Sequence, residues 1–264
     1  MFKRHIFDLV LLAAAMLFFY QPGTCAASVT VNARPNKIAV GTLFNGASVT
    51  VSGVVPAGSE AVVTVTGREE ELHLKTKGRA LGVLWMNLGS VTFHHVPTLY
   101  IVNTPKSLEP SGDAGSGEGL GSDAGFESVK AQAEITPTPA DPGDRAHLLQ
   151  EFLKLKEGEG LYAVNGGTVH YGVGEEGMRS FETDIHIPAR VAPGEYEIKA
   201  EAFNGGHATD AAIQHIEVEE VGAPALLSSL AFKHGGLYGL LAVLVAIGAG
   251  LVMDFFFSGS GGAH

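Results

Sequence analysis

Apolar and polar residues alternate with a period of two over much of the chain between residues 28 and 104. In residues 48–52, valines alternate with serine and threonine, and in residues 72–75, leucines alternate with histidine and lysine. The turn signal of residues 56–59 precedes residues 61–67, in which β-branched side chains predominate. A period of two predicts strands, and short strands separated by turns about every ten residues are typical of a β-sandwich.

The same pattern resumes in the second half of the chain. Residues 181–187 and residues 195–200 both alternate, and a turn signal lies between them at residues 191–194. Together they predict a hairpin with one buried and one solvated face. A last strand is expected over residues 207–218. Residues 56–65 and residues 193–202 each contain a turn followed by a strand, and the two stretches are loosely alike. This leaves open whether the strands form one or two sandwich units.

Residues 106–143 have a different composition, dominated by Gly, Ser, Asp, Glu and Pro. Such a segment has too few apolar side chains to offset the entropy lost on ordering, so a flexible acidic linker is expected here. It contains GLGSDA at residues 119–124, which matches the GxGxxA pattern of dinucleotide-binding turns. No strand pattern precedes this stretch and no helix pattern starts at its last glycine, so we expect no nucleotide site.

A helix is expected directly after this linker, with Asp144 as its N-cap and residues 157–160 as its end. Five apolar side chains recur near the helical period and form one stripe: Leu148, Leu149, Phe152, Leu153 and Leu155. The pattern therefore predicts a mostly β fold of one or two Ig-like β-sandwich units with one short helix between them. The first unit would span residues 28–105, and the helix with the second unit residues 144–222.

The N-terminus has the order of features of a secretory signal peptide, over residues 1–26. Lys3 and Arg4 precede a mostly apolar stretch, and small residues follow it. Cleavage near Ala26 or Ala27 would remove Cys25, the single cysteine of the chain. The alternative is a lipoprotein with a lipidated Cys25.

The C-terminal part contains an uncharged stretch from Gly235 to Met253. At about 1.5 Å per helical residue, it spans roughly 28 Å, close to the thickness of a hydrocarbon core. We expect a single transmembrane helix within a juxtamembrane and membrane segment over residues 224–257. Flanking charges do not set its orientation, but the signal peptide would export the large middle region and leave residues 258–264 in the cytoplasm.

Composition and charge exclude several classes of protein. The chain has 28 acidic and 17 basic residues and a formal net charge of −11. This balance argues against a nucleic-acid-binding protein, which needs clustered Lys and Arg. One cysteine allows neither a disulfide framework nor a Cys-based zinc site. The GxSxG, HExxH and GxxxxGK motifs are all missing from the sequence, so neither an enzyme nor a cofactor is expected.

One candidate metal site lies on the predicted acidic strand. Glu182, Asp184 and His186 alternate and so share one face of a strand, and Glu195 and Glu197 would lie on its predicted hairpin partner. Oxygen ligands in this arrangement suit a hard cation. The alternative is an ordinary solvated face.

A second candidate metal site is the pair His94 and His95. Neighbours in a strand point to opposite faces, so both side chains cannot easily serve one site.

Two further sets of residues are candidates for binding a partner. Trp85 and Asn87 belong to an apolar strand before a loop expected at residues 89–90, where Trp85 is either a core ring or part of a binding surface. In the membrane segment, Ala242, Ala246 and Gly250 are spaced four apart. Small residues at this spacing let another helix approach closely, although Gly and Ala are also common in membrane helices.

The ordered motifs resemble those of a family of bacterial transmembrane proteins of the alpha-proteobacterial type, labelled Alph_Pro_TM. The resembling stretches are residues 38–53, 62–67, 82–87, 97–100, 161–162, 187–188, 193–196 and 234–242. The acidic insert and the lack of basic residues after the membrane segment depart from the family pattern.

In a bacterium, the expected signal peptide and membrane segment predict a protein of the inner membrane with a periplasmic main domain and with membrane lipid as one partner. The resemblance implies an accessory role beside a multi-span permease that resembles sulfite exporters. The alternative is a periplasmic metal-binding protein. No catalytic residues are carried over from the family.

Overall fold

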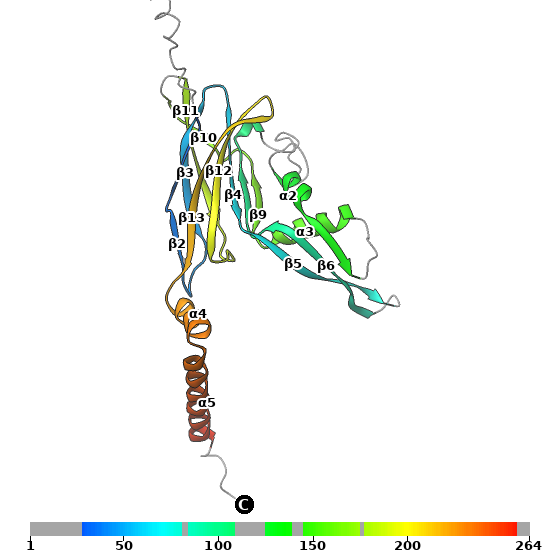
Figure 1. The fold of residues 1–264 in the computed structure, drawn as a ribbon, viewed down its shortest axis with the longest axis vertical. Helices are drawn as coiled ribbons and strands as arrows, with labels where there is room; N and C mark the ends of the chain where they lie inside the picture. Colours follow the sequence, from blue (N-terminus) through cyan, green and yellow to red (C-terminus); the bar gives the residue numbers. More distant parts are fainter. Residues whose placement is uncertain (1–27, 81–83, 109–124, 139–144, 175–176, 258–264) are drawn as a thin grey trace, which may run out of the picture.

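Two β-sheets packed face to face form the body of the protein, and a long helix extends from one end of it (Figure 1). The computed structural model describes residues 28–80, 84–108, 125–138, 145–174 and 177–257. The predicted signal peptide, the motif at residues 119–124, Asp144 and the C-terminal tail lie outside the described residues. The mostly β fold with one C-terminal apolar helix is confirmed.

The first sheet has four strands in the order β1-β3-β11-β10. Their bounds are β1 Thr30–Arg34, β3 Ala47–Pro56, β11 Met178–Ile187 and β10 His170–Tyr171. The second sheet has six strands in the order β2-β13-β12-β4-β7-β9. Their bounds are β2 Lys37–Val40, β13 His207–Glu220, β12 Gly194–Asn204, β4 Glu60–Gly67, β7 Tyr100–Asn103 and β9 Tyr162–Asn165.

Alternation along the strands builds the core between these sheets. Val49 and Val51 of β3 are fully buried, whereas the side chains of Ser48 and Thr50 face outward. Ile185 of β11 is also fully buried between the outward-facing Asp184 and His186 of the same strand. The predicted strand faces are therefore confirmed here.

Strands from both halves of the chain share both sheets. β3 pairs with β11 over ten residues, and β4 pairs with β12 over eight. The expected separate second unit over residues 144–222 is therefore wrong, and of the two alternatives the single sandwich holds. β3 and β4 of the first half each have one edge paired with a strand of the second half, so neither half completes a sheet alone.

The predicted hairpin of residues 181–187 and 195–200 is also wrong. β11 belongs to the four-stranded sheet and β12 to the six-stranded sheet, so the chain crosses from one sheet to the other at the turn. Both strands alternate because each has one face on the core. Alternation identifies the buried face but not the neighbouring strand.

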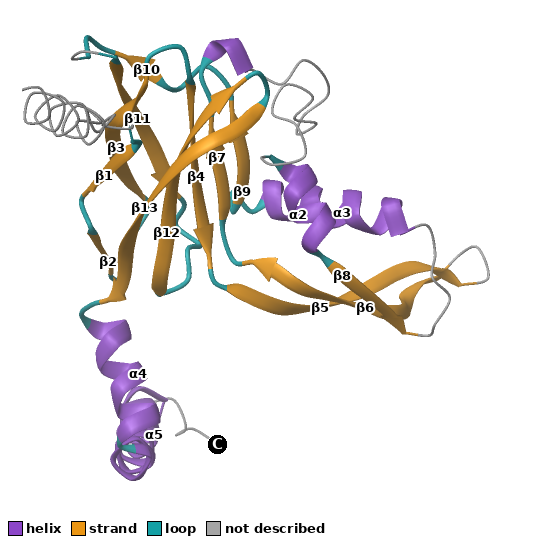
Figure 2. Ribbon diagram, turned by 45° about the horizontal axis from the view of Figure 1, so that its top comes forward, coloured by secondary structure: helices purple, strands orange, loops and turns teal. Residues whose placement is uncertain are grey.

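A third sheet and two helices lie beside the six-stranded sheet (Figure 2). The sheet has the order β5-β6-β8, with β5 Glu69–Ala80, β6 Leu84–Pro97 and β8 Glu134–Thr138. The helices are α2 Phe126–Gln132 and α3 Arg145–Gly158, and a short 3-10 turn, η1, spans Lys106–Leu108. The helix expected near residue 145 is thus confirmed, whereas β6 runs continuously through the loop expected at residues 89–90.

These elements enclose a second core rich in aromatic side chains. Phe93 stacks on Phe152 with ring centroids 4.6 Å apart, and Tyr162 contacts Tyr100, Phe126 and Phe152. The six-stranded sheet therefore has buried residues on both faces where it meets this core, which explains the unbroken apolar run at the start of β4.

Part of the segment predicted to be a linker is ordered. Residues 125–138 contain α2 and β8, and Phe126 and Val129 are buried in the aromatic core. The expectation of a linker over residues 106–143 is therefore wrong for this stretch. Two of its few large apolar side chains, Phe126 and Val129, lie one turn apart in one helix, which the average composition of the segment concealed.

Two helices follow the last strand. α4 spans Ala223–Lys233 and α5 spans Gly235–Phe257, and the chain bends at His234 between them. The most apolar stretch of 18 residues within Gly235–Phe256 has a mean hydropathy of 2.2, and none of its side chains is buried. Length and composition make α5 a candidate membrane span, in agreement with the sequence.

Candidate functional site

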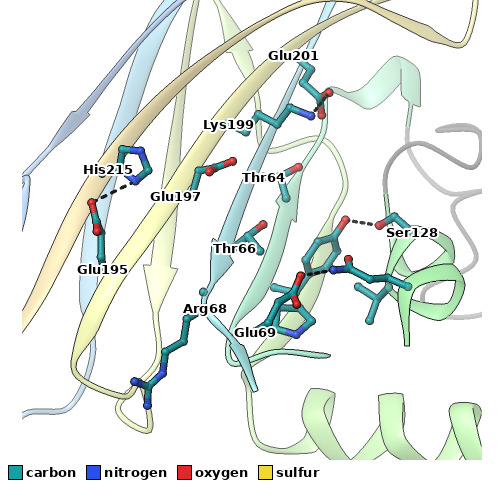
Figure 3. A pocket seen from close by; sticks show the side chains of 15 residues that line it. Thr64, Thr66, Arg68, Glu69, Ser128, Glu195, Glu197, Lys199, Glu201 and His215 are labelled. Carbon is teal, nitrogen blue, oxygen red and sulfur yellow. Dashed lines mark hydrogen bonds and ion pairs between the residues drawn. The ribbon is translucent and has the colours of Figure 1, made fainter. Parts of the chain in front are cut away.

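An open groove of about 490 Å³ lies beside the six-stranded sheet, where α2 and the start of β5 approach it (Figure 3). Its floor consists of the outward side chains of β4, β12 and β13, and its wall of residues from β5 and α2. Most lining residues are polar or charged. They are Thr64, Thr66, Gly67, Arg68, Glu69, Pro97, Tyr100, Ser128, Val129, Gln132, Glu195, Glu197, Lys199, Glu201 and His215.

Carboxylates have a nitrogen partner at two places on the floor. The Lys199 ammonium lies 2.7 Å from Glu201, whose side chain is only 7% exposed. His215 Nδ1 lies 3.4 Å from Glu195, and both of these side chains are largely exposed. The buried carboxylate of Glu201 thus has a fixed partner, whereas the His215–Glu195 contact is accessible to solvent and contributes little to stability.

Two charged side chains of the groove have no partner among the described residues. Glu197 lies on β12 between Glu195 and Lys199, and Arg68 lies at the junction of β4 and β5. Neither side chain makes a hydrogen bond or ion pair within the described part of the chain. As far as the structure describes the chain, the groove therefore presents the carboxylate of Glu197 and the guanidinium of Arg68 to a ligand or a partner protein.

The wall of the groove is held by hydrogen bonds between elements. The Tyr100 hydroxyl donates to the Gly125 carbonyl oxygen over 3.1 Å and lies 2.8 Å from Ser128 Oγ. Burial raises the pKa of Tyr100 above its ordinary value, so the phenol stays protonated. On the same wall, Gln132 donates to Glu69. These contacts fix α2 against the sheet and define the shape of the groove.

The sequence alone did not reveal this groove. Its one visible signal is the charged outward face of β12, where Glu195, Glu197, Lys199 and Glu201 alternate with apolar residues. That pattern also fits a solvated face. Only the position of α2, from a segment predicted to be a linker, makes it one side of a groove.

The predicted metal residues do share a face. Glu182, Asp184 and His186 are exposed on the outer face of β11, and Asp184 Oδ1 accepts a hydrogen bond from Thr50 Oγ1 over 2.6 Å. Glu195 and Glu197 lie on the other sheet, so the expected second row of ligands is wrong. Within the described residues, no group of three or more His, Cys, Asp or Glu side chains is placed to hold a metal ion.

The pair His94 and His95 lies at a bulge, where the register of β5 and β6 shifts. His95 has a φ of 56° and contacts Glu69 over 3.0 Å, and His94 lies 3.6 Å from Glu71. The bulge breaks the alternation, so both imidazoles contact carboxylates of β5. The argument from alternation, which placed them on opposite faces, does not apply at this point.

The predicted partner-binding residues occupy two places. Asn87 is exposed on β6, and Trp85 lies on the same strand opposite Arg79 of β5. Ala242, Ala246 and Gly250 lie along α5, and a Cβ added at Gly250 would meet nothing within 4 Å. Neither Asn87 nor these three residues of α5 line the groove.

One family of known proteins matches most of the chain. A family model described as "Putative transmembrane protein (Alph_Pro_TM)" matches residues 28–258, which include all three sheets and α5. No curated protein matches the chain.

Proposed function

The chain belongs to the Alph_Pro_TM family of transmembrane proteins, and from this premise we propose that it is an accessory subunit of a multi-span transport permease. In this proposal, α5 anchors the protein in the bacterial inner membrane and the β domain lies on the periplasmic side. There it binds the permease or the solute that the permease carries. The family resemblance favours a permease similar to sulfite exporters.

The short connection between the β domain and α5 is the observation that carries this proposal. β13 ends at Glu220, α4 begins at Ala223, and α5 begins at Gly235. Only α4 separates the last strand from the membrane helix, so the domain is held close to the bilayer surface. A domain held there encounters membrane proteins at a high effective concentration.

The surface of the protein offers two contacts for such a partner. The side chains of α5 are exposed along its apolar length, so the helix is free to pack against another helix in lipid. The groove adds the charges of Glu197 and Arg68 outside the bilayer, which have no partner within the described residues. Charged groups of this kind select a partner by complementary charge.

Site-specific photocrosslinking in intact membranes tests the proposal. A photoreactive residue at Ala246 or at Glu197 of the full chain should form an adduct with a multi-span membrane protein. The matched control positions are Gly248, on the opposite side of α5, and Glu182, on the outer face of the other sheet. Adducts that are equally abundant at the control positions, or absent at all four, would contradict the accessory role.

A further inference from the structure

The hairpin of β5 and β6 carries a gradient of charge along its length. Three carboxylates, Glu69–Glu71, lie where β5 leaves the sandwich. Three cations, Lys75, Lys77 and Arg79, lie toward the other end of the same strand. At about 3.3 Å per residue, the twelve residues of β5 span roughly 40 Å, so the two groups are well separated.

The basic end of the hairpin extends beyond the third strand of its sheet. Toward the far end of the hairpin, the pairing of β6 with β8 stops at Ser90, opposite Thr138. Beyond that point the described part of the hairpin is a two-stranded ribbon. The side chains of Lys77 and Asn87 are exposed there, Met86 is 49% exposed, and the exposed Lys75 lies at the boundary, opposite Ser90. An exposed end with cations and an apolar side chain is suited to a surface that is both anionic and partly apolar.

The hairpin points toward the end of the molecule that carries the membrane helix. In Figure 1 it slants away from the sandwich, and its far end reaches about the level of α4, just above the start of α5. In Figure 2, from a second direction, the hairpin leaves the same lower end of the sandwich as α4 and runs to the side of the molecule. The basic end therefore lies near the height at which α5 enters a bilayer.

We propose that the basic end of the β5–β6 hairpin docks on the anionic phospholipid headgroups of the membrane that α5 spans. The chain as a whole has a formal charge of −11, so most of its surface is repelled by anionic lipid. Lys75 and Lys77 are attracted, and this attraction falls off within a Debye length of the surface. Two contacts, α5 and the hairpin, then fix the orientation of the domain and its groove relative to the bilayer.

The single tryptophan of the chain makes this docking measurable without a label. Trp85 lies opposite Arg79 in the hairpin register, and the chain contains no other tryptophan. The full chain is reconstituted into vesicles of phosphatidylcholine and phosphatidylglycerol, with or without bromine on the acyl chains. Bromine quenches indole fluorescence only at short range. We expect strong quenching in the brominated anionic vesicles and clearly weaker quenching in vesicles of phosphatidylcholine alone.

Charge reversal tests the residues that carry the docking. Lys75→Glu combined with Lys77→Glu should lower the ratio of docked to undocked hairpin by on the order of tenfold or more, and thus remove most of the quenching. Lys106→Glu is the matched control, because Lys106 is an exposed lysine of η1, outside the hairpin. It should leave quenching unchanged. Circular dichroism shows whether each variant is folded.

Salt provides a second measurement on the unaltered protein. At about 1 M salt the Debye length falls to about 3 Å, so the quenching of the wild-type chain should largely disappear. Equal fluorescence in brominated and ordinary anionic vesicles would overturn the proposal. Quenching that persists in the charge-reversed variant and in high salt would also overturn it, since the contact would then be apolar. Because these vesicles contain no permease, the result is independent of the proposed accessory role.

Discussion

Asn103 Nδ2 donates a hydrogen bond to Thr183 Oγ1 over 2.8 Å in the centre of the sandwich, where both residues are almost completely buried. Asn103 ends β7 of the six-stranded sheet, and Thr183 lies on β11 of the four-stranded sheet. The same Asn103 amide donates to the Asp184 carbonyl oxygen and accepts from Asn165 Nδ2. One side chain therefore links the two sheets and the two halves of the chain.

Removal of this link should destabilise the protein. Asn103→Ala leaves the Asn165 amide and the Thr183 hydroxyl without this partner, and we expect a loss of about 2 kcal/mol in the free energy of unfolding. Thr183→Val should lose about 1 kcal/mol. Denaturant unfolding of the full chain in detergent, followed by circular dichroism, measures both. Thr50→Val, on the outer face, is the matched control and should change stability by less than about 0.5 kcal/mol.

Loss of either partner of a buried ion pair beside the aromatic core should destabilise the protein by different amounts. The side chain of Lys156 is 4% exposed, and its Nζ lies 2.9 Å from Glu70 Oε1. The same nitrogen lies 5.9 Å from the ring centroids of Phe152 and Tyr162. Glu70→Ala leaves the ammonium without its carboxylate and should lower the free energy of unfolding by about 2 kcal/mol. The loss is smaller than for a fully buried pair because the Glu70 side chain is 32% exposed. Lys156→Met keeps the apolar stem packed and should cost less than about 1 kcal/mol. Equal losses in the two variants would contradict this account.

A close approach of strands requires glycine at position 53. A Cβ at Gly53 would lie 2.0 Å from the Thr30 carbonyl oxygen and 2.8 Å from the Phe181 ring. Since backbone cannot move aside cheaply, Gly53→Ala should destabilise by about 3 kcal/mol. Gly158→Ala is the matched control, at the end of α3 with nothing within 4 Å of the added Cβ. It should be neutral or stabilise by up to about 1 kcal/mol, and thermal unfolding compares the two.

The sequence predicts the strands and their buried faces well because these are local properties. Residues 48–52 alternate in sequence and in burial alike, and so do residues 181–187. The partner of each strand is not a local property. Thr183 lies opposite Val51 in the register of β11 and β3. The two residues are far apart in the sequence, and the pattern of neither strand specifies that they pair.

The candidate site was predicted less well than the fold. The outward charges of β12 are visible in sequence, but the groove exists only because Tyr100 and Ser128 hold α2 beside that strand. Phe126 and Val129 dock that helix, and they lie next to a long polar stretch whose average composition predicts disorder. These two apolar side chains indicate the helix, but the average composition of the whole stretch conceals them.

Reporter fusions test the proposed orientation in the membrane. A reporter that is active only outside the cytoplasm should be active when fused after Gly125 and inactive when fused after Ala263. The reason is that one apolar helix, α5, separates the two positions. Expression of both fusions must be confirmed by immunoblotting. The opposite pattern of activity would place the β domain in the cytoplasm and would contradict the periplasmic role.

The small residues of α5 give the last prediction. Ala246 and Gly250 are one helical turn apart and lie on one side of the helix, whereas Gly248 is rotated from both by about 200°. A leucine at position 246 or 250 would keep another helix from close approach, so Ala246→Leu and Gly250→Leu should abolish association with a partner helix or with a second copy.

Membrane insertion should remain normal in both variants, because leucine is at least as apolar as the residues it replaces. Gly248→Leu is the matched control, since it adds the same side chain to the other side of the same helix, where a Cβ again meets nothing within 4 Å. Crosslinking yield in membranes, compared at equal amounts of inserted protein, measures the association. If the control reduces the yield as much as Gly250→Leu does, bulk on any side of α5 is harmful and the stripe has no special role. If none of the three variants reduces it, α5 is an anchor alone, and any partner must bind through the groove of the β domain.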